Sequence, residues 1–387
     1  MACDRRDFLK KASWAALGAG CTLALPGNVS SAAVPFPAGA RTRSVTWRRA
    51  EFQSPLPDGA VLCTLCPCDP AKAVEGRVEN GETCVCHVRV NRGGVLYVSN
   101  YGRAGALHLD PLEKNPLFHF LPGASALAVA APGCSLTCRG CQNWQLSQVG
   151  PEGVDTVDAP PSKVVSMALE NRCRAISFTF SEPMMSWEYL RDVSGLAHRK
   201  GLRTTVVSGG YVCADPVRKL AGLVDAFSVS VKAFTEADYR RYANGKYKTV
   251  LEAMAVAKST GAWLEVVVLV IPTVSDDLPK MQTFLRWVVR NLGPDTPVHF
   301  DRYWPAYRMT NVPQTPQRTL ENARALALAE GVKYAYVGNL PGHWGANTAC
   351  PTCGRVLVRR VGFKVIENRL SGGACPGCGS PIPGRWS

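Results

Sequence analysis

Residues 127–144 read LAVAAPGCSLTCRGCQNW, an apolar run followed by three closely spaced cysteines. The run Leu127–Ala131 is typical of a buried β-strand. Cys134, Cys138 and Cys141 follow it, with three and then two residues between them. This spacing lets one short loop bring three thiolates to a [4Fe–4S] cluster, and three protein ligands for four irons leave one iron open. Three ligands of a zinc site are the alternative interpretation.

Apolar segments alternate with helical segments after this motif. The expected strands are Leu127–Ala131, Ala175–Phe180, Arg203–Ser208, Ala226–Val231, Leu264–Ile271, Val298–Tyr303 and Tyr334–Val337. The expected helices are Ser162–Asn171, Trp187–Lys200, Pro216–Leu223, Val250–Thr260, Leu278–Asn291 and Pro316–Glu330, the last with Thr315 as its N-cap. The alternation predicts an α/β fold with a parallel sheet. Six such units favour a partial (β/α)6 barrel, with a doubly wound sheet as the alternative.

The position of the three cysteines in such a barrel is informative. The loop that carries them directly follows the first expected strand. In a barrel this loop lies at the carboxyl end of the strands, the face on which barrel enzymes place their active sites. We therefore expect the reactive centre of the chain at this face.

The chain has 16 cysteines among 387 residues, and most of them fall into three groups. The N-terminal group is Cys63, Cys66, Cys68, Cys84 and Cys86, the central group is Cys134, Cys138 and Cys141, and the C-terminal group is Cys350, Cys353, Cys375 and Cys378. Short spacings of this kind favour metal binding over disulfides that join distant elements.

Changes in composition divide the chain into five segments. We expect a signal segment over residues 1–33, a linker over 34–55, a cysteine-rich N-terminal domain over 56–123, the barrel over 124–343, and a zinc-ribbon-like or rubredoxin-like segment over 344–387. The composition, 46% hydrophobic and 19% charged, is ordinary for a folded protein and permits a sizeable buried core.

The formal net charge of +14 is weak evidence for a nucleic-acid partner. Residues 1–50 contribute +6 of it, and metal-bound thiolates add negative charge that the formal count omits. The remaining basic residues are dispersed, without an arginine-rich run or a basic patch interleaved with aromatic residues. We therefore expect no nucleic-acid partner.

A long ordered series of short motifs covers essentially residues 60–380. They are Tyr101-Gly102-Arg103, Asp110–Lys114, Pro116–Gly123, Cys141–Trp144, Phe180–Pro183, Gly210–Val212, Val231–Phe234, His299-Phe300 and Val337–His343. This series, together with the cysteine spacing, resembles the radical S-adenosylmethionine (SAM) enzyme of the AmmeMemoRadiSam system, which is similar to pyruvate formate-lyase activating enzymes.

The resemblance implies a chemistry. The open iron would chelate the amino and carboxylate groups of SAM, and one electron from the cluster, supplied by a low-potential donor, would cleave SAM to a 5′-deoxyadenosyl radical. This radical would abstract hydrogen from a substrate, either a protein, as in glycyl-radical activation, or a small molecule.

The resemblance also implies further cofactor-binding residues at the ends of the strands. Glu182 would accept hydrogen bonds from the ammonium group of SAM, and Ser208 would meet its ribose or carboxylate. Lys232 and His299 are expected at the ends of later strands on the same face. The chain departs from the family at Ser230, where Asp is usual, and at Gly209, where Asn is usual.

The flanking cysteine groups predict two more metal sites. Cys63, Cys66, Cys68 and Cys86 are expected to hold a structural zinc or an auxiliary iron–sulfur cluster, with Cys84 as an extra cysteine and His87 as a substitute ligand. Disulfides are the competing interpretation there if the protein is exported. The four C-terminal cysteines are typical of a closed site for zinc or a single iron.

The first residues favour export. Arg5 and Arg6 precede a Phe-Leu-Lys sequence, the apolar stretch Ala12–Leu25 and small residues up to Ala33, a pattern that resembles a twin-arginine signal. The apolar stretch is too short and too weakly apolar for a stable membrane span. SAM and low-potential electrons are cytoplasmic supplies, so the sequence leaves localisation open.

Two other functions compete with a radical enzyme. An exported iron–sulfur electron carrier would need a fourth cysteine at the central cluster, and no cysteine close to Cys141 supplies one. A metal-binding scaffold that uses the flanking groups would tolerate substitution of Cys138. The three-cysteine spacing and the barrel together favour the radical enzyme.

Overall fold

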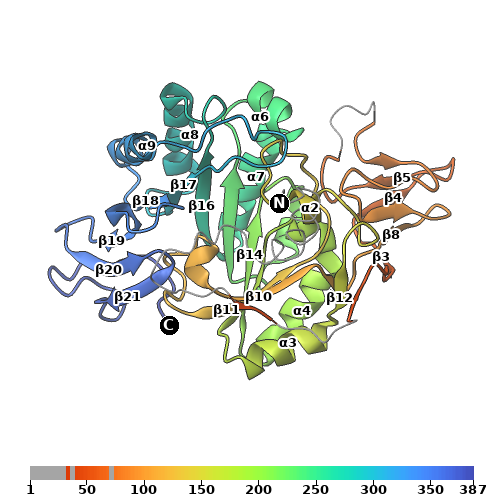
Figure 1. Cartoon of the computed structure of the whole chain (residues 1–387), viewed down its shortest axis with the longest axis horizontal. Helices are drawn as coiled ribbons and strands as arrows, with labels where there is room; N and C mark the ends of the chain where they lie inside the picture. Colours follow the sequence, from red (N-terminus) through yellow and green to blue (C-terminus); the bar gives the residue numbers. More distant parts are fainter. Residues whose placement is uncertain (1–31, 35–39, 69–73) are drawn as a thin grey trace, which may run out of the picture.

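A computed structural model describes residues 32–34, 40–68 and 74–387 of the chain. Its main sheet has nine strands in the order β1-β10-β11-β13-β14-β15-β16-β17-β18 (Figure 1). Their bounds are β1 Ala32–Ala33, β10 Ala106–Pro111, β11 Ser125–Ala130, β13 Ala175–Phe178, β14 Arg203–Ser208, β15 Ala226–Val231, β16 Trp263–Val270, β17 Val298–Arg302 and β18 Ala335–Gly338.

The strands from β11 to β18 are parallel and lie side by side in their order along the chain. Helices connect them: α3 Pro161–Glu170, α4 Trp187–Arg199, α5 Ala214–Arg218, α6 Glu236–Ala243, α7 Tyr247–Ser259, α8 Leu278–Asn291 and α9 Gln317–Ala329. A doubly wound sheet would reverse its strand order at a switch point. The sequential order therefore confirms the predicted barrel. No pairing joins β18 to β1 within the described residues, so the barrel is partial.

Local sequence explains several boundaries of these elements. Asp277 Oδ1 accepts a hydrogen bond from Lys280 N at 2.9 Å and caps the start of α8. The predicted cap of the last helix is different. Thr315 Oγ1 accepts a hydrogen bond from Tyr303 N at 2.9 Å and donates one to Val270 O, so this side chain joins the ends of β17 and β16 rather than capping α9.

The N-terminal region forms small sheets with the orders β2-β12-β9, β3-β8-β7 and β4-β5-β6. The bounds are β2 Arg41–Thr42, β3 Arg48–Arg49, β4 Gln53–Pro55, β5 Val61–Cys63, β6 Arg77–Val78, β7 Arg89–Asn91, β8 Leu96–Val98, β9 Arg103–Ala104 and β12 Thr156–Asp158. The stretch predicted as a linker thus contributes β2, β3 and β4. Strand β10, from the predicted cysteine-rich domain, pairs antiparallel with β11 of the barrel.

The C-terminal segment forms a small sheet of β19 Thr348–Ala349, β20 Val356–Val361 and β21 Lys364–Asn368. Phe118, Tyr336, Leu357 and Ile382 lie in one apolar cluster, which joins this sheet to the end of the barrel. The segment therefore packs onto the barrel, and Figure 1 shows it beside β18.

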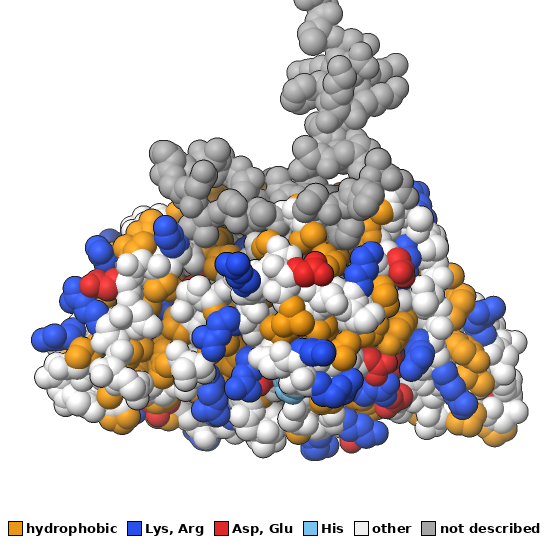
Figure 2. Space-filling view, turned by 90° about the horizontal axis from the view of Figure 1, so that it is seen from below, with side chains coloured by type: hydrophobic (Ala, Val, Ile, Leu, Met, Phe, Trp, Pro, Cys, Tyr) orange, Lys and Arg blue, Asp and Glu red, His pale blue; other side chains and the backbone are white. Residues whose placement is uncertain are grey.

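Lys and Arg side chains lie interspersed with acidic and apolar ones on the face shown in Figure 2. None of the helices in the described part of the chain is both long and apolar enough to cross a membrane. The predicted signal segment lies almost wholly outside the described residues, since the structure describes only residues 32 and 33 of it.

Candidate active site and metal centres

The central cysteine loop lies between β11 and the short helix α2, Trp144–Ser147, at the carboxyl end of the parallel strands. Two backbone hydrogen bonds of 3.0 Å hold it: Thr137 N donates to Ala243 O, and Arg139 N donates to Tyr242 O. Both acceptors lie in the last turn of α6, so this helix holds the cysteine loop in place. This placement agrees with the position expected from the sequence.

The sulfur atoms of this loop receive hydrogen bonds from nearby groups. Leu136 N lies 3.4 Å from Cys134 Sγ and donates to it, and Ser147 Oγ lies 3.3 Å from Cys141 Sγ. Burial raises the pKa of Cys138 to about 12, although the charge of Lys232 acts in the opposite direction. Burial, followed by the Glu182 carboxylate, raises the pKa of Cys134 well above its ordinary value. Bound cations would stabilise these thiols as thiolates, and hydrogen bonds to sulfur are a usual feature of iron–sulfur sites.

The separation of the three sulfurs distinguishes a cluster from a single ion. Among the described residues, the C-terminal cysteines and three of the N-terminal ones have ligand atoms that all lie within 4.8 Å of one another, and the central three form no such group. In a [4Fe–4S] cluster each thiolate binds a different iron, so its ligands stand farther apart than those of one ion. The loop therefore fits a cluster better than a zinc site.

Glu182 and Ser208, both predicted site residues, are in direct contact. Ser208 Oγ donates to Glu182 Oε1 at 2.8 Å, Gly209 N donates to Oε2 at 2.8 Å, and Met184 N donates to Oε1 at 3.2 Å. The Glu182 side chain is buried, and burial raises its pKa against these hydrogen bonds. Ser208 Oγ also lies 3.0 Å from Oε2, so its one proton is shared between the two oxygens. Three donors thus serve a carboxylate with about four acceptor positions, which leaves capacity for a donor from a ligand.

Lys232, another predicted site residue, directly follows β15. Its charge acts on Cys138, Glu182 and Asp301, which places its ammonium group in the neighbourhood of all three. Lys232 takes part in none of the ion pairs of the described residues. Lys232 thus supplies positive charge beside the cysteine loop.

Asp301, near the carboxyl end of β17, was not predicted as a site residue. It is 8% exposed, and within the described part of the chain its carboxylate accepts one side-chain hydrogen bond, a long one of 3.4 Å from Asn339 Nδ2. Gly338 leaves room for it, because a Cβ there would lie 1.8 Å from Asp301 Oδ1. Burial raises the pKa of Asp301 to about 6, against the charges of His299 and Lys232.

The structure corrects the predicted position of His299. The strand β17 begins at Val298, so His299 lies near its amino end and not at the carboxyl end. Its Nε2 is 2.7 Å from Glu265 Oε2, and both side chains are buried. The expected strand was right, but His299 is its second residue, and its ring pairs with Glu265. His299 therefore belongs to the core.

Comparison with known proteins agrees with this geometry. The model of the Radical SAM superfamily matches residues 129–285, a stretch that contains the central cysteines, Glu182, Ser208 and Lys232. An uncharacterized protein of Methanocaldococcus jannaschii is 37% identical over 337 residues, which cover 87% of this chain and 98% of that protein. The chain belongs to the radical SAM superfamily.

Several solved structures are similar to this radical SAM chain. A domain of a pyruvate-formate lyase-activating enzyme from Bacteroides vulgatus is 11% identical with a TM-score of 0.38, covering 43% of this chain and 99% of that one. SuiB of Streptococcus suis bound to S-adenosylmethionine is 13% identical with a TM-score of 0.44, covering 59% and 53%. The [FeFe]-hydrogenase maturase HydG of Carboxydothermus hydrogenoformans is 15% identical with a TM-score of 0.42, covering 55% and 53%.

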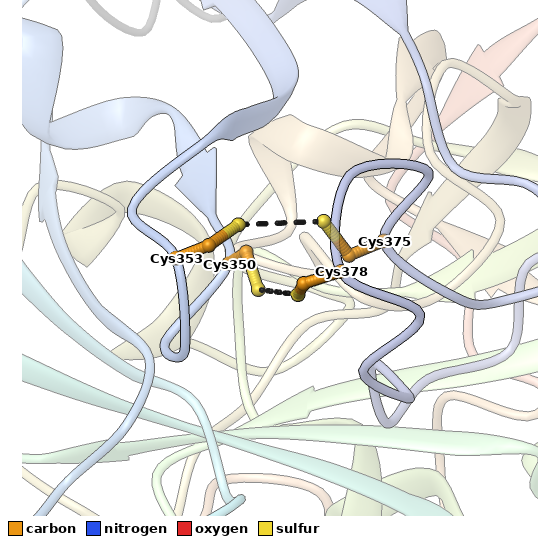
Figure 3. A group of neighbouring side chains, drawn as sticks. All are labelled: Cys350, Cys353, Cys375 and Cys378. Atoms are coloured by element: carbon orange, nitrogen blue, oxygen red, sulfur yellow. Dashed lines mark hydrogen bonds between the residues drawn. The ribbon is translucent and has the colours of Figure 1, made fainter.

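The four C-terminal cysteines of this radical SAM chain converge as predicted (Figure 3). Cys350 Sγ lies 3.6 Å from Cys378 Sγ, and Cys353 Sγ lies 3.7 Å from Cys375 Sγ. Four sulfurs placed tetrahedrally at 2.3 Å from a zinc ion would be about 3.8 Å apart. The group thus fits one tetrahedral ion, with zinc or a single iron as candidates.

The N-terminal cysteines also converge, but the group includes Cys84, which was not among the four predicted ligands. The sulfurs of Cys63, Cys68 and Cys84 lie within 4.8 Å of one another, and Cys66 Sγ is 3.9 Å from Cys68 Sγ. The sequence predicted Cys84 to be an extra cysteine, whereas the structure places its sulfur among the ligand atoms of this group. All described cysteines are free thiols.

Sequence reasoning missed Asp301 and the central position of Cys84. The motif His299-Phe300-Asp301 contained a signal for the first, since residues two apart on a strand share a face and only the later one reaches the carboxyl end. For Cys84 no comparable signal exists, because its spacing from Cys63 and Cys68 does not show that the three sulfurs meet in the fold.

Proposed function

We propose that this chain holds a [4Fe–4S] cluster on Cys134, Cys138 and Cys141 and cleaves SAM reductively at the open iron. The observation that carries the proposal is the set of three thiols on one loop at the carboxyl end of the strands. Among the described residues, no hydrogen bond or close thiol contact joins a fourth cysteine to these three. A bound cluster would supply the electron that breaks the sulfonium bond of SAM and so starts radical chemistry.

The surrounding side chains have complementary roles in this proposal. Glu182 is held by Ser208 and Gly209 and keeps a free acceptor position for the ammonium group of SAM. Lys232 supplies positive charge near the thiolates. These contacts favour catalysis over an electron carrier, because a carrier needs no ligand site beside its cluster.

We further propose that the chain acts as the radical enzyme of an AmmeMemoRadiSam system, with a chemistry similar to that of activating enzymes. The ordered motifs quoted above support this assignment. Its substrate is then a protein or a small molecule with an unactivated C–H bond, and its reductant is a low-potential electron donor. The two flanking cysteine groups would hold metal ions that stabilise the fold.

The test uses the full chain, reconstituted anaerobically with iron and sulfide, reduced and supplied with SAM. We expect the parent to form 5′-deoxyadenosine and Cys138→Ala to form none above background. Cys173→Ala is the matched control, since Cys173 is a buried cysteine outside the three groups. A fully loaded and reducible parent that never cleaves SAM would contradict the proposal and favour the electron carrier.

A further inference from the structure

The N-terminal cysteine group is buried against the barrel. All five of its cysteines, Cys63, Cys66, Cys68, Cys84 and Cys86, are between 1% and 6% exposed. The sulfurs of Cys63, Cys68 and Cys84 lie within 4.8 Å of one another, and Cys66 Sγ lies 3.9 Å from Cys68 Sγ, near the distance of about 3.8 Å expected around one tetrahedral zinc ion. These separations are shorter than those expected of thiolates bound to different irons. The group therefore fits a single ion.

A buried cation stands beside these sulfurs. Arg89 is fully buried and pairs with Glu188 through Nη2, at 2.8 Å from Oε1. Its Nε has no hydrogen-bond partner within the described residues. Four thiolates around a divalent ion carry a net charge of −2, and a buried charge needs a compensating partner. Arg89 would compensate part of this charge, and its unpaired donor would suit a metal-bound sulfur.

The group contacts the central loop at two points. Gly133, the residue before Cys134, has a φ of +102°, and a Cβ there would lie 2.6 Å from Cys86 O. Tyr211 forms the second contact. Its backbone oxygen accepts a hydrogen bond from Ser135 Oγ at 3.2 Å, and its hydroxyl donates to Cys68 O at 3.3 Å. The turns that carry Cys68 and Cys86 thus support both sides of Cys134.

We propose that Cys63, Cys66, Cys68 and Cys84 bind one structural zinc ion, and that this ion sets the position of the central cysteine loop through Gly133 and Tyr211. The zinc ion would fix the turns of residues 63–68 and 84–86, since metal binding couples directly to folding. Without it, the backbone contacts at Gly133 and Tyr211 would lose their support. The C-terminal group has no such connection, since its apolar contacts lie at the other end of the barrel.

Zinc counting by mass spectrometry tests the metal, on full-length protein purified anaerobically from zinc-supplemented cells. The two thiol groups predict two zinc ions in the parent, one in Cys84→Ser, one in Cys350→Ser and two in the buried-cysteine control Cys173→Ser. A single zinc ion in the parent that Cys350→Ser removes would overturn the proposal. Iron in place of the zinc ion that Cys84→Ser should remove would overturn it as well.

Thiol accessibility gives a second measurement that does not depend on folding of Cys84→Ser. Cys353 and Cys378 are exposed, whereas the N-terminal thiols are buried. An organomercurial reagent should therefore release zinc from the parent in a fast and a slow phase. Cys350→Ser should show the slow phase alone. A Cys350→Ser chain that releases all its zinc in a fast phase contradicts a buried N-terminal ion.

Iron and sulfide contents test the coupling to the central loop. After reconstitution, Cys84→Ser should retain less than half of the parent's cluster iron, whereas Cys350→Ser should retain all of it. Gly133→Ala should lose cluster iron but keep both zinc ions, since the added Cβ strains the backbone beside Cys134 and meets Cys86 O, whereas the thiols of both zinc sites lie outside this change. Full iron loading in Cys84→Ser would overturn the coupling. None of these measurements depends on SAM cleavage, so failure of the proposed function is distinguishable from failure here.

Discussion

The two ends of the partial barrel bury their charges in different ways. At the amino end, Glu265 accepts hydrogen bonds of 2.7 to 3.0 Å from Phe118 N, His119 N, Trp263 Nε1 and His299 Nε2. At the carboxyl end, the Asp301 carboxylate accepts a single, long side-chain hydrogen bond among the residues that the structure describes. Lys232 has no ion pair there among the described residues.

This difference indicates a structural role for the amino end and a ligand-binding role for the carboxyl end. Buried polar groups in folded proteins are almost always satisfied, and the Glu265 carboxylate with its four donors behaves as an ordinary core group, although His299 Nδ1 beside it has no hydrogen-bond partner among the described residues. A buried carboxylate with spare capacity, beside a cation and a cysteine loop, indicates a place kept for a ligand. Substitutions at the two ends should therefore affect different quantities, and the effects below run from the largest to the smallest.

Glu265→Ala should cause the largest loss of stability. Although burial alone would raise the pKa of Glu265, the hydrogen bond and charge of His299 hold it below its ordinary value. Removing the Glu265 carboxylate leaves its four buried donors without an acceptor, at a cost of about 3–5 kcal/mol in the free energy of unfolding. Denaturant titration measures the change, with the partly exposed Glu321→Ala as control. A cost below about 1 kcal/mol would mean that the amino end is not a satisfied core.

Asp301→Asn should instead raise stability at high pH. Since burial raises the pKa of Asp301 to about 6, above its ordinary value of 3.8, the folded chain binds this proton more tightly than the unfolded chain. The contribution to stability is therefore present at low pH and is lost as pH rises from about 4 to about 6. Above that range the charged group costs up to about 3 kcal/mol.

Denaturant titrations at pH 8 and pH 4.5 test this sign. The stability gain of Asp301→Asn should be large at pH 8 and small at pH 4.5. A gain that does not depend on pH would show that neighbouring groups already compensate the charge of the Asp301 carboxylate. Asp301 would then resemble Glu265, and the two ends of the barrel would not differ at this residue.

Glu182→Gln should weaken SAM binding. The amide loses the charge that would attract the ammonium group of SAM, and its NH2 would face donors that Glu182 now accepts from. The expected loss in SAM affinity is about 10- to 100-fold, the range for polar groups that orient a bound cofactor. Equilibrium dialysis of the reconstituted chain measures it. Unchanged affinity would place SAM away from Glu182.

Ser208→Ala should have the smallest effect. Its hydroxyl donates to Glu182, and loss of one such charge-assisted hydrogen bond costs about 1.5–3 kcal/mol at most. Because Gly209 N still donates to Glu182, we expect a decrease in SAM affinity smaller than that of Glu182→Gln. A larger decrease would mean that Ser208 contacts SAM itself.

The sequence alone predicted a large part of this picture. Hydrophobic periodicity is local, so the alternation of strands and helices and the (β/α)6 architecture were readable without coordinates. Cysteine spacing is equally local, which is why the convergence of the C-terminal thiols could be foreseen. The sequence did not show that residues 41–55 form strands, because short exposed strands are stabilised by their partners rather than by their own composition.

What only the tertiary structure decided depends on register and packing. Strand β17 was expected, but whether His299 or Asp301 faces the cysteine loop depends on where the strand begins relative to its neighbours. Thr315 joins two strand ends instead of capping a helix, since a competing acceptor lies within reach only in the folded chain. The Cys84 sulfur meets those of Cys63 and Cys68 only in the folded chain. Covalent spacing determines which groups can meet locally, whereas long-range packing decides which of them do.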